Sequence, residues 1–203
     1  IISSAERIEN GLEVTSMGID VARYGDDKTV FTILKNGNIE LIESYEQTSI
    51  TEIVTRSIQL IHDYNIDPNY VGIDSVGVGA GVVDDLKSAG YDVIELQGGS
   101  KPEESQYEEA FLPFNLRSQM YYELRRDMMN GQIGNLTDET LKLELQSIQY
   151  EIYSDKKVKV ISKEAIKKLL GRSPDYADSL VYANWVKTYR GGIKWYMAIS
   201  GGL

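Results

Sequence analysis

The sequence predicts one α/β domain with a central mixed sheet, in which three antiparallel strands are followed by parallel strands and flanking helices. An Asn36-Gly37 turn separates two runs rich in β-branched residues, and it predicts an antiparallel hairpin because both residues tolerate a positive φ. Residues 70–96 then read as strand, helix and strand, which favours a parallel pair with a right-handed crossover. The 203 residues, 42% of them hydrophobic, can bury one sizeable core.

The predicted elements follow the order βββαβαβ, with further helices and a small β-hairpin after them. Ser49 and Glu52 form a capping box for the first helix, and Ser173-Pro174 supplies the N-cap and first residue of the last one. Strands are expected at residues 16–22, 29–34, 39–45, 70–74 and 91–96. Helices are expected at residues 49–64, 82–89, 115–130, 138–146 and 173–189, and the hairpin at residues 148–152 and 157–161.

Composition narrows the possible chemistry. The chain has no cysteine and a single histidine, His62, which excludes disulfides, zinc–thiolate sites and histidine-rich metal centres. Any metal ion must therefore bind oxygen ligands. The formal net charge of −10 argues against a strong hold on nucleic acid by bulk electrostatics. No apolar run approaches the roughly 20 residues of a membrane span, and no signal-peptide pattern occurs, so we expect a soluble, intracellular protein.

Two aspartates stand at the ends of predicted strands. Asp20 and Asp74 each complete the same run, Gly-Ile-Asp, on strands that the element order can place side by side. Functional groups of open α/β sheets gather beyond the carboxyl ends of parallel strands, and neighbouring strands are about 4.8 Å apart. We therefore expect both carboxylates to reach one metal ion. The alternative is that each aspartate only starts a turn, which is common at strand ends.

The last helix offers a third carboxylate. Asp175 and Asp178 are three residues apart and share a helix face near its positive N-terminus. Both remain candidates, although an acid in the first helical turn can serve the helix alone. Converging carboxylates repel each other unless cations lie between them. Oxygen ligands with open positions suit Mg²⁺ or Mn²⁺, and a pair of such ions can promote in-line displacement at phosphorus.

Three sequence runs together resemble the nuclease domain of tailed-bacteriophage terminase large subunits. They are residues 18–29, 72–79 and 173–180, within a likeness that extends over about residues 14–187. The resemblance implies a ribonuclease-H-like fold and an endonuclease that cuts concatemeric double-stranded DNA during viral genome packaging by a two-metal-ion mechanism. It also implies that Asp20, Asp74 and Asp178 are the catalytic, metal-binding acids. On the helix geometry, Asp175 remains a competing metal ligand.

The same resemblance implies a domain organisation and partners. Members of the family carry an ATP-driven translocase in their other half, whereas no Gly-x-x-x-x-Gly-Lys-Ser/Thr phosphate loop occurs here. We therefore expect residues 1–12 to be a linker from a missing N-terminal ATPase domain and residues 13–203 to form the nuclease domain. The expected partners are double-stranded DNA, that ATPase domain, the small terminase subunit and the portal protein, in the host cell cytoplasm and away from any membrane.

Basic residues supply candidate DNA contacts. Most of them lie between residues 156 and 172, just before the third acid, although lysines on a helix are usually solvated. The candidates are Arg23, Lys28, Lys163, Lys167, Lys168 and Arg172. Two further residues have open roles. Asp27 either turns the chain or contacts a metal ion, and Arg117 either matches a pattern of the family or pairs with an acid.

Two other functions remain open. Actin-like and sugar-kinase ATPases share a related fold, and a strand-end aspartate followed by glycines, here Gly77, Gly79 and Gly81, can bind nucleotide phosphates. A non-catalytic docking module of the packaging motor would carry the same acids without using them. DNA cleavage, ATP binding and the effect of Asp20→Asn separate these functions.

Overall fold

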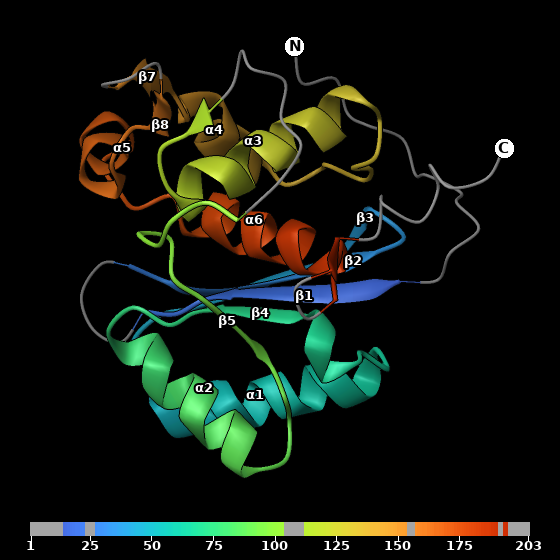
Figure 1. Ribbon diagram of the computed structural model, residues 1–203. Coiled ribbons are helices and arrows are strands. Elements are labelled where there is room, and N and C mark those ends of the chain that lie inside the picture. The colour runs from blue at the N-terminus through green and yellow to red at the C-terminus, as the bar shows by residue number, and fades with distance from the viewer. Residues whose placement is uncertain (1–13, 23–26, 104–111, 154–156, 191–192, 195–203) are drawn as a thin grey trace, which may run out of the picture.

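The computed structural model describes residues 14–22, 27–103, 112–153, 157–190 and 193–194. The expected linker at residues 1–12 and the DNA-contact candidate Arg23 lie outside these ranges. A five-stranded sheet of order β3-β2-β1-β4-β5 forms the centre of the molecule (Figure 1). Its strands are β1 (Thr15–Asp20), β2 (Thr29–Lys35), β3 (Asn38–Tyr45), β4 (Val71–Asp74) and β5 (Ile94–Leu96). The predicted mixed sheet is confirmed, since β1, β2 and β3 pair antiparallel whereas β4 and β5 pair parallel.

Helices cover both faces of this sheet. One face packs against α1 (Ile50–Asp63) and α2 (Val78–Ser88), and the other against α6 (Asp175–Lys187). Two more helices, α3 (Leu116–Met129) and α4 (Glu139–Ser147), lie over α6 on its far side (Figure 1). The remaining elements are η1 (Pro68–Tyr70), β6 (Leu112–Pro113), β7 (Tyr150–Ile152), β8 (Lys157–Val160), α5 (Lys163–Leu170), β9 (Tyr189–Arg190) and β10 (Ile193–Lys194).

Local signals in the sequence set several element ends as predicted. Ser49 and Glu52 form the capping box of α1, and Asn36-Gly37 turns the β2–β3 hairpin with positive φ at both residues. The helix predicted at residues 82–89 begins earlier, at Val78, so Gly79 and Gly81 belong to it and Gly77 is its N-cap. Gly79 suits this first turn because a Cβ there would overlap the carbonyl of Asp74. No helix in the described ranges is long and apolar enough to cross a membrane.

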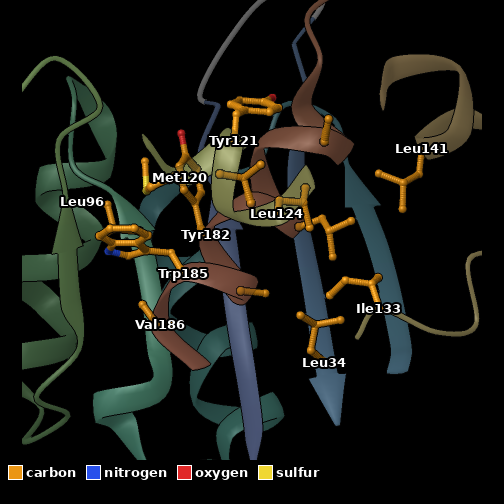
Figure 2. Packing of buried hydrophobic residues seen from close by; sticks show 14 of the residues in the cluster. Leu34, Leu96, Met120, Tyr121, Leu124, Ile133, Leu141, Tyr182, Trp185 and Val186 are labelled. Atoms are coloured by element: carbon orange, nitrogen blue, oxygen red, sulfur yellow. The ribbon is translucent and has the colours of Figure 1, made fainter. Parts of the chain in front are cut away.

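Two hydrophobic clusters divide the core between the faces of the sheet. The cluster beneath the sheet joins β1, β2 and β4 to α1 and α2. The cluster above it is built around α6, and Figure 2 shows Leu96 from the sheet beside Trp185 of α6, and Leu34 beside Ile133, which follows α3. Eleven of the 13 residues of α6 are buried, because the helix lies between the sheet and the outer helices.

Close contact between α6 and the sheet depends on two glycines. Gly18 and Gly72 are register partners on β1 and β4 and present a flat surface to the helix. A Cβ built at Gly18 would overlap the backbone of Ser179 and Ala183, and one at Gly72 would lie 2.7 Å from a methyl carbon of Val186. The first residue of each Gly-Ile-Asp run is therefore a packing requirement of the helix.

Gly18→Ala is expected to lower the free energy of unfolding by at least about 2 kcal/mol, because the new methyl group meets the α6 backbone rather than a side chain that can move aside. Urea denaturation measures the change. The matched control is Gly99→Ala, where a Cβ has open space, and this change is expected to stay within about 0.5 kcal/mol of wild type. Equal effects of the two substitutions would contradict the packing account.

Candidate active site

The sheet places Asp20 and Asp74 side by side. β1 and β4 are parallel neighbours in which Ile19 pairs with Ile73, so the following aspartates end the two strands at the same edge. Side chains alternate along a strand, so each aspartate points to the same face as the glycine two residues before it. That face carries α6. Asp20 is 3% exposed and Asp74 is half-buried.

The N-terminus of α6 brings two more acids to this edge. The predicted cap is wrong by one residue: Pro174 is the N-cap, has no capping side-chain hydrogen bond, and is followed by Asp175 as the first helical residue. Ser173 instead donates from Oγ to Oδ1 of Asp27 at 2.7 Å. The first turn of α6 therefore has a backbone amide, that of Ala177, whose hydrogen-bond acceptor comes from another element.

Glu144 on α4 supplies that missing cap. Its Oε2 accepts a hydrogen bond from the amide of Ala177 at 2.8 Å, and its Oε1 accepts one from Nη1 of Arg172 at 2.6 Å. The Glu144 side chain is fully buried, and burial raises its pKa to about 7 although the amide and the guanidinium favour the carboxylate. Glu144 therefore fixes the helix start from which Asp175 and Asp178 project.

Lys163, the first residue of α5, lies at the centre of the acids. Its Nζ is 3.0 Å from Oδ2 of Asp20, 3.3 Å from Oδ2 of Asp178 and 3.4 Å from Oδ1 of Asp175. Oδ2 of Asp175 accepts a hydrogen bond from the Lys28 amide at 2.9 Å, whereas its buried Oδ1 has no hydrogen-bond partner. The structure therefore brings Asp175 and Asp178 together with Asp20 around one ammonium.

Asp178 is also held from the side of α3. Its Oδ1 accepts hydrogen bonds from the Tyr121 hydroxyl at 2.6 Å and from Nη2 of Arg117 at 3.2 Å. Arg117 donates in addition to the Ile161 carbonyl at 3.0 Å, and its guanidinium carbon lies 4.8 Å from the centre of the Tyr121 ring. On α6, the Tyr182 hydroxyl points to Oδ2 of Asp74 at 3.4 Å. The hydrogen bonds from Tyr121 and Arg117 leave the Asp178 carboxylate little freedom to rotate.

Burial and neighbouring charges shift the pKa values of Asp20 and Asp178 in opposite directions. Burial raises the pKa of Asp20 well above its usual range, and the neighbouring Asp178, Asp175 and Asp74 add to the rise while Lys163 opposes it. Burial also opposes ionisation of Asp178, yet Arg117 and Lys163 hold its pKa below the usual value. Burial alone would lower the pKa of Lys163, but Asp20, Asp178 and Asp175 raise it, so Lys163 stays an ammonium. The edge of the sheet is a site of excess negative charge that depends on a cation.

The carboxylate oxygens of this site suit a hard divalent cation, but in this structure the Lys163 ammonium lies between them. Among the described residues, no three acidic or imidazole side chains are gathered in the geometry of a metal site. The ammonium occupies the space between the carboxylates and is the cation that their charge requires. Oxygen ligands from Asp20, Asp178 and Oδ1 of Asp175, which accepts no hydrogen bond, would suit Mg²⁺ or Mn²⁺ in place of that ammonium.

Most of the basic residues expected to contact DNA lie next to acids. The Lys167 ammonium is 2.7 Å from Asp27, Arg172 binds Glu144, and Lys28 is 3.0 Å from Glu46. Lys163 lies among the aspartates, whereas Lys168 is exposed on α5. Arg117 pairs with an acid, as one of its two open roles suggested.

Sequence reasoning missed Glu144 and the two tyrosines as parts of this site. Tyr121 is 3% exposed in the core, and its hydroxyl donates a hydrogen bond to Asp178. Tyr182 had a signal in the sequence, because it follows Asp178 by four residues and so shares its helix face. Glu144 had none, since only the packing of α4 on α6 brings it to the helix start.

Comparison with solved structures shows that this chain shares the ribonuclease-H-like fold seen in nuclease domains of phage large terminase subunits. The nuclease domain of the large terminase subunit gp2 of bacterial virus Sf6 superposes with a TM-score of 0.73 at 21% sequence identity, covering 84% of this chain and 87% of that one. The fold expected from the three sequence runs is thereby confirmed.

A second solved structure gives the same result. The large terminase nuclease from thermophilic phage G20c with bound magnesium superposes with a TM-score of 0.61 at 20% identity, covering 90% of this chain and 84% of that one. A mutant of the Sf6 domain solved with manganese reaches a TM-score of 0.71 at 18% identity over 89% of each chain. Neither a family profile nor a curated sequence relative matches the chain.

Glu144→Ala is expected to cost about 2–3 kcal/mol of stability, because the Ala177 amide loses its buried acceptor and the start of α6 loses its cap. Glu144→Gln keeps an acceptor oxygen and should recover most of that loss. Glu139→Ala, on an exposed position of the same helix, is the control and should change little. Thermal unfolding measures the stability of the three variants. Equal stabilities of Glu144→Ala and Glu139→Ala would refute the capping role.

Proposed function

We propose that this chain is a metal-dependent endonuclease domain of a viral DNA-packaging terminase, which cuts double-stranded DNA by two-metal-ion phosphodiester hydrolysis. The observation that carries the proposal is the gathering of Asp20, Asp178 and Asp175 around the Lys163 ammonium, with Asp74 at the neighbouring strand end. The ribonuclease-H-like fold and the metal-bound nucleases that share it support the same reading.

Each acid has a part in the proposed chemistry. Asp20, Asp74 and Asp178 would hold the divalent ions, and Asp175 would add or replace a ligand through Oδ1, which accepts no hydrogen bond. Bound Mg²⁺ or Mn²⁺ would supply the Lewis acidity that activates water and steadies the leaving oxygen. Arg117 and Tyr121 would keep one oxygen of Asp178 in place, which leaves Oδ2 to the metal side.

The proposal gives Lys163 a role different from the DNA contact first expected of it. Its ammonium balances the buried negative charge while no metal is bound, and it has to move or yield when a divalent cation enters. Lys163 starts α5 with only two residues between it and the end of β8, so a movement at this junction would carry its side chain with it. The remaining expected partners, among them an ATPase domain, a small terminase subunit and a portal protein, stay predictions.

The rival functions make different use of the same residues. An actin-like ATPase would need the glycines after Asp74 for phosphate, but Gly79 is occupied with close packing against the Asp74 carbonyl. A docking module would have no need to bury three acids around a cation, since an ionised carboxylate taken out of water is costly. The convergence of acids therefore favours the nuclease.

Asp20→Asn and Asp178→Asn are each expected to reduce cleavage of plasmid DNA in Mg²⁺ or Mn²⁺ by at least about 100-fold, because a neutral amide cannot hold a divalent cation as a carboxylate does. EDTA should abolish cleavage by the wild type. Asp63→Asn, an exposed change on α1, is the matched control and should cut normally. Full cleavage by Asp20→Asn would remove the proposal, and the docking module would then take its place.

Lys163→Ala is expected to tighten Mn²⁺ binding by about tenfold, because the competing ammonium is gone while the carboxylates remain. Isothermal titration calorimetry without DNA measures the dissociation constant. Lys168→Ala removes the same charge from an exposed position on the same helix and should leave Mn²⁺ affinity unchanged. Unchanged or weaker Mn²⁺ binding by Lys163→Ala would show that Lys163 does not compete for the site.

A further inference from the structure

The outer face of the small sheet β6-β8-β7 carries lysine side chains next to aromatic rings. Lys157 and Lys159 lie on the same side of β8, because side chains alternate along a strand, and Val158 and Val160 point the other way. The inner side packs on α3, where the Val160 amide donates to Ser118 Oγ at 3.1 Å. The outer side is left without a covering element among the described residues.

Two aromatic rings hold one of these lysines in place. The rings of Phe114 and Tyr153 are 4.5 Å apart at their centres in an edge arrangement. The Lys159 ammonium lies 5.0 Å from the centre of the Phe114 ring and 5.1 Å from that of Tyr153. Cation–π contacts of this kind orient the ammonium without neutralising its charge or using its N–H donors.

Lys157 and Lys159 differ in this respect from Lys163, Lys167 and Arg172. Lys163, Lys167 and Arg172 all lie within 3.4 Å of a carboxylate, so their charge is already balanced. Neither hairpin lysine has a carboxylate at ion-pair distance within the described part of the chain. Glu151 is the cross-strand neighbour of Lys159 on the same face and lowers the local charge without cancelling it.

This face adjoins the acidic site through strand β8 and the residues that follow it. The Ile161 carbonyl, two residues after Lys159, accepts the hydrogen bond from Arg117, which binds Asp178. Lys163 comes two residues later still. Figure 1 shows β7, β8 and α5 at the same end of the molecule as the carboxyl end of β1. A polymer bound across the acids would therefore meet the hairpin.

We propose that the outer face of this small sheet is a DNA-contact surface, in which Lys157 and Lys159 bind backbone phosphates and Phe114 with Tyr153 keeps Lys159 oriented toward them. The inference rests on the proposed function for the identity of the polymer. Charge supports it, since a chain of net charge −10 needs a local cationic surface wherever it meets phosphates. A lysine that is already oriented loses less side-chain entropy when it binds.

The test is fluorescence anisotropy with the complete chain and a labelled 30-base-pair duplex in Ca²⁺ at several salt concentrations, about 50 to 200 mM. Lys159→Ala and Lys157→Ala should each weaken duplex binding by about three- to tenfold and reduce the salt slope by about one. Phe114→Leu keeps an apolar side chain but removes the ring, and it should weaken binding by about two- to threefold with an unchanged salt slope.

The matched control is Lys35→Ala, an exposed lysine at the opposite end of the sheet, which should bind DNA within twofold of wild type. Thermal unfolding checks that all variants are folded. If Lys157→Ala and Lys159→Ala bind like Lys35→Ala, or if the wild type binds no duplex, the inference is overturned.

Cleavage separates this inference from the proposed function. If the wild type binds duplex DNA through these lysines but cuts none in Mn²⁺, the contact surface stands and the nuclease proposal fails. If the wild type cuts DNA and both lysine variants bind and cut as it does, the nuclease proposal stands and the contact surface fails.

Discussion

The close packing of α6 on two glycines is the constraint on which the rest of this structure depends. Gly18 and Gly72 let the helix backbone approach β1 and β4, and the helix start then meets the carboxyl ends of the same strands. Buried polar pairs fix the alignment: Ser16 Oγ donates to the Ala183 carbonyl at 2.9 Å, and the hydroxyls of Thr32 and Ser179 are 2.7 Å apart. Any helix held further from the sheet would carry its acids away from Asp20.

The same packing gathers negative charge at the edge of the sheet, and two basic side chains offset that charge. Four acids share one edge of the sheet, and burial makes their ionisation costly. Lys163 and Arg117 offset the charge from two different elements, one at the start of α5 and one on α3. Lys163 contacts three carboxylates, whereas Arg117 contacts one. Removal of the Lys163 ammonium would therefore increase the affinity of the site for a metal cation more than removal of Arg117 would.

A second set of contacts keeps the start of α6 in position. Glu144 caps the helix from α4, and Asp27 ties the β1–β2 connection to α5 and α6 through Lys167 and Ser173. These groups are outside the proposed metal ligands, yet the positions of Asp175 and Asp178 depend on them. The acids that hold the start of α6 therefore lie next to the proposed metal ligands, and the number of acids in the sequence alone does not separate the two groups.

The sequence predicted the sheet well because its signals are local. The Asn36-Gly37 turn, the capping box at Ser49 and the alternation of strands and helices all act over a few residues. The Gly-Ile-Asp repeat also pointed to the strand ends, although for Gly18 and Gly72 the reason is helix packing. The start of α2 was misplaced because Gly79 disfavours a helix intrinsically and is retained for a close tertiary approach.

The rest depended on contacts between distant residues. Lys163 is 143 residues from Asp20 along the chain, and Glu144 reaches Ala177 across 33 residues, so no spacing rule indicates either pair. The basic cluster was visible in the sequence, but only the structure separates the lysines that balance acids from those of the hairpin. The sequence pattern indicates which charged residues could take part in the site, whereas tertiary packing determines which of them contact each other.

Crystals of the chain soaked in Mn²⁺ and measured at the manganese absorption edge test the central claim most directly. The account predicts anomalous density between Asp20, Asp74 and Asp178, with the Lys163 ammonium displaced from its position among them. Mn²⁺ bound only elsewhere, with Lys163 still in contact with Asp20 and Asp178, would contradict it.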